Sequence, residues 1–112
     1  MKVNLKAACL QLTSTSDIYK NLKETKDLCS KAIDKNASFI LTPEVTNITS
    51  LNRQKLKRSV FLERDDPFLI EFTRIAKEKS VWILLGSIVI KDNKSKLYNR
   101  SYLINSLSLI HI

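Results

Sequence analysis

Phe39-Ile40-Leu41-Thr42-Pro43-Glu44 is the stretch that decides the fold, because an apolar run ends there in a proline that is followed by a carboxylate. The run is short and rich in large apolar residues, which is typical of a strand covered on both faces. Pro43 has no N–H to donate to a continuing ladder, so we expect the strand to end before it. Ligands of open α/β sheets gather outside the carboxyl ends of strands. Glu44 is therefore a candidate general acid or base at a strand end.

The residues before this strand predict another strand and then an amphipathic helix. Val3 to Leu12 reads as the strand, and Asp17 or Ser16 can cap the helix that follows. Apolar residues then recur at helical spacings over about four turns. They are Ile18, Leu22, Leu28, Cys29, Ala32 and Ile33. Asn36 is a tolerable left-handed stop for this helix.

The residues after the strand predict further elements from their period and turn chemistry. In chain order these are a polar, basic connection with one short helix, a helix that begins at an Asp-Pro step, an apolar strand, a turn and a returning strand: Thr46–Arg64 with Gln54–Val60, Asp66–Pro67 onward, Val81–Ile90, Asp92–Lys96 and Leu97–Asn105. Gly86 is expected where another backbone approaches closely. Strands that alternate with helices and end in a hairpin predict an α/β sheet with helices on one side.

Composition bounds the class of protein. One domain is expected for 112 residues, and 44% hydrophobic residues exclude a chain that is disordered by composition. The sequence holds no apolar run of about 18 residues or more, so we expect no transmembrane helix and no membrane partner. Asn4 and Lys6 interrupt the apolar stretch that a lipoprotein signal would need before Cys9.

Two cysteines and one histidine are the remaining nucleophile or ligand candidates. Cys9 falls in the first strand pattern and Cys29 on the apolar face of the first helix, where a free cysteine usually behaves as a small hydrophobe. We therefore predict that both are structural and slow to react with thiol reagents, which favours a reducing cytoplasm. His111 lies in an apolar tail, and its spacing supports no Cys/His pair. We predict no metal site and no cofactor.

The net charge of +8 raises the possibility of an anionic partner. Its densest cluster is Arg53–Arg58, which contains no aromatic residue that would stack on a base and is soon followed by acidic residues. A solvated surface is the favoured interpretation, and we expect no nucleic-acid partner. A basic binding module without catalysis stays open as an alternative, and retention on an anionic column that falls steeply with salt would favour it.

The order of these elements resembles the amino-terminal part of the nitrilase, or carbon–nitrogen hydrolase, superfamily. The segments that carry the resemblance are Lys6–Leu12, Thr13–Asp17 with Asn21, Phe39–Glu44, Val81–Ile88 and Leu97–Asn105. It covers nearly all of residues 1–112 and implies a partial α-β-β-α sandwich. This chain would supply material for one of the two sheets, with that sheet's inner face left bare. The segment Gln11–Asp17 is most similar to the branch that contains deaminated-glutathione amidases and omega-amidases.

The resemblance also implies a chemistry, the hydrolysis of non-peptide C–N bonds in small amides or nitriles. Family members use a Glu general base, a Lys that stabilises the tetrahedral intermediate and a Cys nucleophile. Glu44 matches the first, whereas without the resemblance it would read as an exposed loop acid. The family's Lys and Cys would follow beyond Ile112, after the Tyr98–Asn99 step.

We therefore expect a domain truncated before two of its three catalytic residues and inactive alone. It would associate with a remainder encoded downstream or form a homo-oligomer. A structural subunit completed by another chain is the second alternative.

Overall fold

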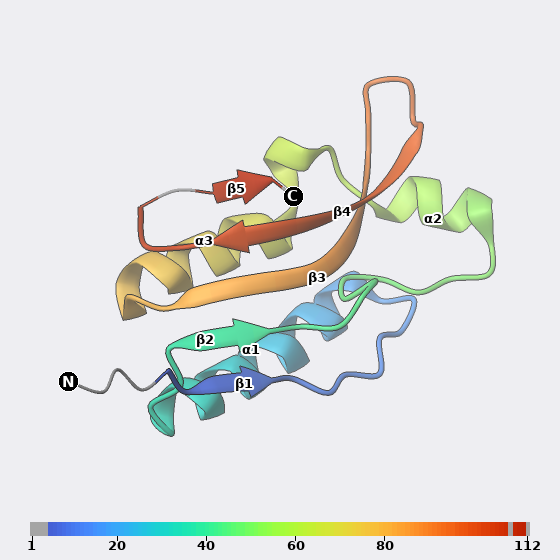
Figure 1. The fold of residues 1–112 in the computed structure, drawn as a ribbon. Helices are drawn as coiled ribbons and strands as arrows, with labels where there is room; N and C mark the ends of the chain where they lie inside the picture. Colours follow the sequence, from blue (N-terminus) through green and yellow to red (C-terminus); the bar gives the residue numbers. More distant parts are fainter. Residues whose placement is uncertain (1–4, 108, 112) are drawn as a thin grey trace.

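The computed structural model describes residues 5–107 and, by their backbone alone, residues 109–111. Figure 1 shows its elements, which in chain order are β1 (Ala7–Cys9), α1 (Ile18–Asp34), β2 (Phe39–Leu41), α2 (Arg53–Ser59), the short 3₁₀ helix η1 (Glu63–Asp65), α3 (Pro67–Lys79), β3 (Trp82–Lys91), β4 (Leu97–Ile104) and β5 (Leu109–His111). The strands form one five-stranded sheet in the order β1-β2-β3-β4-β5. The pairs β1–β2 and β2–β3 are parallel, and β3–β4 and β4–β5 are antiparallel.

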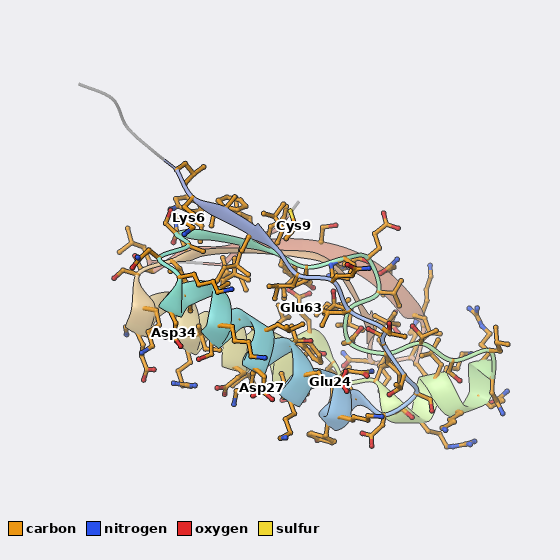
Figure 2. The ribbon with its side chains drawn as sticks, turned by 90° about the horizontal axis from the view of Figure 1, so that it is seen from below. Lys6, Cys9, Glu24, Asp27, Asp34 and Glu63 are labelled. Carbon is orange, nitrogen blue, oxygen red and sulfur yellow. The ribbon has the colours of Figure 1, made fainter. Side chains whose placement is uncertain are left out.

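Helices α1 and α3 lie against the same face of the sheet, as Figure 2 shows from below. Strand residues that face them are fully buried, and helix residues such as Phe68 and Phe72 complete the core. The buried strand residues of this core are Ile40, Ile83, Leu85, Ile88, Ile90, Tyr102 and Ile104. The prediction of an α/β sheet with helices on one side is confirmed.

The opposite face of the sheet is much less covered. Trp82 is 41% exposed, and Phe39 and Leu84 are half-buried. Phe39 pairs with Trp82 and Leu41 with Leu84 in the parallel register, so these side chains share one face. Over the described residues, no helix lies on this face. β2 is therefore covered only on the face to which Ile40 points, and the predicted coverage of Phe39–Leu41 on both faces is wrong.

The helix boundaries follow from capping groups that the sequence predicts. The Asp17 carboxylate accepts hydrogen bonds from two amides in the first turn of α1. The Asp66 carboxylate caps α3 in the same way, with Pro67 at the first helical position. Asn36, after α1, and Ser80, at the end of α3, adopt positive φ angles of 68° and 53°. The predicted cap and left-handed stop of α1 and the predicted start of α3 are confirmed.

The amino-terminal strand and its cysteine differ from expectation. The strand predicted over Val3–Leu12 is formed by Ala7–Cys9 alone, since residues 5 and 6 and residues 10–12 are not in the ladder and residues 1–4 lie outside the described chain. Cys9 is exposed, so its predicted core position is wrong. Strand alternation gives the reason, because Ala8 packs against the core and sends Cys9 to the face turned away from α1 and α3 (Figure 2).

The basic cluster Arg53–Arg58 lies largely on the surface of the molecule. The cluster forms α2, an exposed short helix that Leu56 anchors to a small second core of Ile48, Val60 and Val89. In the part of the chain that the structure describes, no helix is long and apolar enough to cross a bilayer. The same residues contain no group of three or more His, Cys, Asp or Glu side chains arranged to hold a metal ion.

Candidate active site

Glu44 lies at the edge of the sheet where β2 ends. β2 finishes at Leu41, and Glu44 and Val45 form a turn shortly after it. β3 pairs with β2 up to Leu84 and then continues to Lys91, so the turn lies alongside the second half of β3. The Glu44 side chain is exposed. The turn thus presents a solvent-accessible carboxylate at the carboxyl end of a parallel strand.

Backbone hydrogen bonds fix this turn to β3. The Thr42 amide donates to the Leu84 carbonyl at 2.9 Å, which extends the ladder by one residue past β2. The Val45 amide donates to Ser87 Oγ at 2.8 Å, and the Thr46 amide donates to the Ser87 carbonyl at 2.9 Å. Ser87 therefore holds both amides that follow Glu44, through its side chain and its backbone.

A bulge in β3 brings Ser87 to the turn. The register with β4 shifts between Leu85 and Ile88, so that β3 carries one residue more than its partner there. Gly86 lies in this bulge, and a Cβ built on it would meet the Thr42 carbonyl oxygen at 2.4 Å and the Pro43 carbonyl oxygen at 2.5 Å. Only glycine fits without moving that backbone, which confirms the predicted close approach.

Val45 is held in a conformation that its side chain disfavours. Its φ angle is 53°, in the left-handed region that β-branched residues rarely enter. Such a residue costs on the order of 1–3 kcal/mol and persists only where its surroundings determine it. The hydrogen bonds from the Val45 and Thr46 amides to Ser87 hold Val45 in this conformation. Strain of this kind is common at functional sites, and in this chain it lies directly beside Glu44.

Threonine and serine side chains close the loop from the inside. Thr46 is fully buried, and its hydroxyl donates to the Pro43 carbonyl and contacts Thr42 Oγ1 at 2.8 Å. Thr42 Oγ1 also accepts a hydrogen bond from the Gly86 amide at 3.2 Å. Ser14 Oγ donates to the Thr46 carbonyl at 2.8 Å and so brings in the segment before α1. These contacts tie the Glu44 turn to two separate parts of the chain.

The two cysteines lie in different environments. Cys29 is fully buried between α1 and the sheet, and burial raises its thiol pKa to about 11. The predicted core position of Cys29 is confirmed, and because a thiol of that pKa would carry almost no thiolate at neutral pH, its slow reaction with thiol reagents stays a prediction. Cys9 is exposed at the end of β1, in register with Leu41.

Sequence reasoning placed Glu44 at the strand end and missed most of the residues that hold it there. Thr42, Thr46 and Asn47 are buried, although they fall in or beside a stretch that reads as a polar surface connection. A signal was present, because the polar residues from Thr42 to Thr49 are small and uncharged apart from Glu44. Small uncharged polar side chains can be buried where they hydrogen-bond to the backbone, whereas charged side chains usually stay in contact with solvent.

The family is decided by comparison with known sequences. The carbon–nitrogen hydrolase family profile matches residues 6–108. The chain belongs to this family. Its sequence is 25% identical over 85 residues to the nitrilase and fragile histidine triad fusion protein NitFhit of Caenorhabditis elegans, covering 76% of this chain and 19% of that protein. It is 22% identical over 106 residues to the deaminated glutathione amidase of Dictyostelium discoideum, covering 89% of this chain and 36% of that enzyme.

Solved structures give the same result for the fold. The crystal structure of C. elegans NitFhit matches with a TM-score of 0.80 at 22% identity, over 94% of this chain and 27% of that one. Saccharomyces cerevisiae Nit3, a member of branch 10 of the nitrilase superfamily, matches with a TM-score of 0.74 at 19% identity, over 96% of this chain and 43% of that one. The chain therefore has the architecture of part of a nitrilase-fold domain and spans less than half of the length of each of these relatives.

Proposed function

We propose that this chain supplies the general base, Glu44, of a carbon–nitrogen hydrolase that cleaves small amides or nitriles. The observation that carries the proposal is the position of Glu44 in a strained turn, held to β3 through Ser87. A general base must stay within hydrogen-bond reach of the proton that it moves, so a fixed turn suits this role better than a free loop does.

In the mechanism that family membership implies, Glu44 has three tasks. Its carboxylate takes the proton of the Cys thiol as sulfur attacks the substrate carbon, and the Lys holds the charge that develops on the substrate. The protonated carboxyl then returns a proton to the leaving amine or ammonia. Finally, the carboxylate activates the water that hydrolyses the thioester. The Lys and Cys would come from outside residues 1–112, in the same polypeptide or in another.

It follows from this proposal that residues 1–112 alone do not turn over amides. General base catalysis contributes on the order of 100- to 10,000-fold, but the covalent route needs a nucleophile first. Deaminated-glutathione and omega-amide substrates are the first to try, since one relative is a deaminated glutathione amidase.

The test is to assay the chain alone and together with the product of any reading frame that follows it. Glu44→Gln should abolish the rate of the combined sample. Glu24→Gln, which changes an exposed glutamate on α1 (Figure 2), is the matched control and should leave the rate unchanged. Turnover that survives Glu44→Gln contradicts the proposal.

A structural role in a larger assembly is a second candidate, favoured by the uncovered sheet face. Trp82 is 41% exposed there beside the half-buried Phe39, Leu41 and Leu84. A contiguous apolar surface of this kind marks an interaction site or an aggregation risk. A second sheet, from the same or another polypeptide, would cover it. A variant with Trp82→Lys that no longer binds the remainder, while Glu44→Gln still binds, would separate this role from catalysis.

A further inference from the structure

Asn47, three residues after Glu44, is a buried side chain with an unusual set of partners. It is fully buried, and its Nδ2 donates to the Val89 carbonyl at 2.8 Å while its Oδ1 accepts from the Val89 amide at 2.9 Å. One amide side chain thus pairs with both polar backbone groups of a β3 residue, as a neighbouring strand would. Asparagine can do this because its side chain carries a donor and an acceptor.

A second buried asparagine, Asn21 of α1, holds Asn47 from the other side. Asn21 is 2% exposed, and its Nδ2 donates to the Asn47 carbonyl at 2.9 Å and to the Thr15 carbonyl at 2.8 Å. Its Oδ1 accepts from the Thr15 amide at 2.9 Å. The two side chains therefore connect β3, the loop that carries Glu44, and the segment that enters α1.

The bonds made by the strained residue and by the two residues after it define the course of the turn. Ser87 holds the amides of Val45 and Thr46, and Val89 holds the side chain of Asn47. The backbone from Val45 to Asn47 is thus fixed at consecutive points along β3. Without the Asn47 contacts, only the bonds to Ser87 would hold the left-handed Val45, so the turn and the adjacent Glu44 side chain would be fixed less firmly.

We propose that Asn47, held by Asn21, is the positioning residue for the Glu44 carboxylate. This inference rests on the proposed function of Glu44 and identifies the contact that keeps the Glu44 carboxylate in its orientation. Asn47 touches no reacting atom in this role and acts through the turn.

The first test needs no catalytic activity and uses the chain itself. Amide hydrogen exchange, measured by NMR under conditions where the chain is folded, reports on the Val45 and Thr46 amides, which both bond to Ser87. In Asn47→Ala, protection at these two amides should fall about tenfold or more, while protection in α3 should stay unchanged. Unchanged protection at the turn, or an equal loss throughout α3, would overturn the inference.

Two further variants sharpen this test. Asn99→Ala is the matched control, because Asn99 is an exposed asparagine directly opposite Val89 in the β3–β4 register, and its loss should leave the turn unchanged. If Asn47→Ala does not fold, Asn47→Asp replaces it. In its ionised form the aspartate keeps an acceptor for the Val89 amide but has no donor for the Val89 carbonyl, so it should also loosen the turn.

The second test uses an active enzyme, in which residues 1–112 are combined with the segment that carries the family's Lys and Cys, in the same polypeptide or in another. There Asn47→Ala should lower kcat about tenfold or more with KM within about twofold, since the base is misaimed and substrate contacts remain. An unchanged kcat would refute the positioning role. Retained activity in Glu44→Gln would instead refute the proposed function, and the exchange data would show separately whether Asn47 fixes the turn.

Discussion

Replacement of Asp66 by asparagine should change how the stability of this chain depends on pH. The Asp66 side chain is fully buried at the start of α3, where one carboxylate oxygen accepts from the Leu69 amide at 2.9 Å. The other oxygen, Oδ2, has no hydrogen-bond partner among the described residues. Burial raises the pKa of Asp66 from 3.8 to about 6, although hydrogen bonds from the Leu69 and Phe68 amides act to lower it.

The size of the effect follows from these two pKa values. A folded-state pKa above the unfolded value means that the folded chain binds the proton more tightly, so protonation stabilises it. This stability is fully present below about pH 3.8 and is lost as the pH rises through about 6. At about 1.4 kcal/mol per pH unit, the loss is on the order of 3 kcal/mol. The asparagine side chain of the variant would not titrate, yet its Oδ1 would still cap the helix.

The measurement compares urea unfolding of the wild type and Asp66→Asn from pH 4 to pH 7, followed by circular dichroism. The free energy of unfolding of the variant minus that of the wild type should rise by about 2.4 kcal/mol over this range, which covers most of the titration. Asp65→Asn, which removes the carboxylate of the neighbouring exposed aspartate, is the matched control. A difference for Asp66→Asn that stays constant within about 0.5 kcal/mol would refute the argument.

Three further predictions concern the sheet. Gly86→Ala should lower the free energy of unfolding by about 1–3 kcal/mol, because its Cβ would overlap the backbone that leads to Glu44; an unchanged urea midpoint would contradict this. A thiol reagent should modify exposed Cys9 rapidly and buried Cys29 only on unfolding, and equal rates at both would be inconsistent with the fold. Residues 1–112 alone should self-associate through the uncovered face, and Trp82→Lys should reduce this in sedimentation velocity; a wild-type monomer at high concentration would argue against it.

The elements with a strong local signal were predictable from the sequence. The helix after Asp17 and the helix after Asp66 carry both a cap and an apolar stripe, and Val81–Ile90 is a long apolar run. The strand β5 carries no such signal, because Leu109–His111 is defined only by its pairing with Tyr102–Ile104 across the sheet. Three residues are too few to show a strand period, even though the partner strand β4 directly precedes them in the chain.

In the candidate site, too, the sequence predicts the features with a local signal and misses those that depend on contacts between distant residues. The position of Glu44 after β2 follows from an apolar run and a proline, both of which are local. The side chain of Asn47 hydrogen-bonds to the backbone of Val89, which lies 42 positions along the chain. Because the partner is a backbone group, the residue type at position 89 gives no sign of this contact. The error at Cys9 has a related cause. Alternation predicts which residues share a face of a strand, but only the packing of α1 and α3 decides which face is covered.

The hydrogen bonds of the Glu44 turn have a consequence for heat resistance. β3 and β4 are joined by a short turn, so their pairing closes a small loop, whereas the bonds to Ser87 and Val89 each close a loop of 42 positions. Contacts that close long loops and hold a strained residue form late and open early. An enzyme that contains this segment should therefore lose activity on warming at temperatures where its β3–β4 hairpin is still intact.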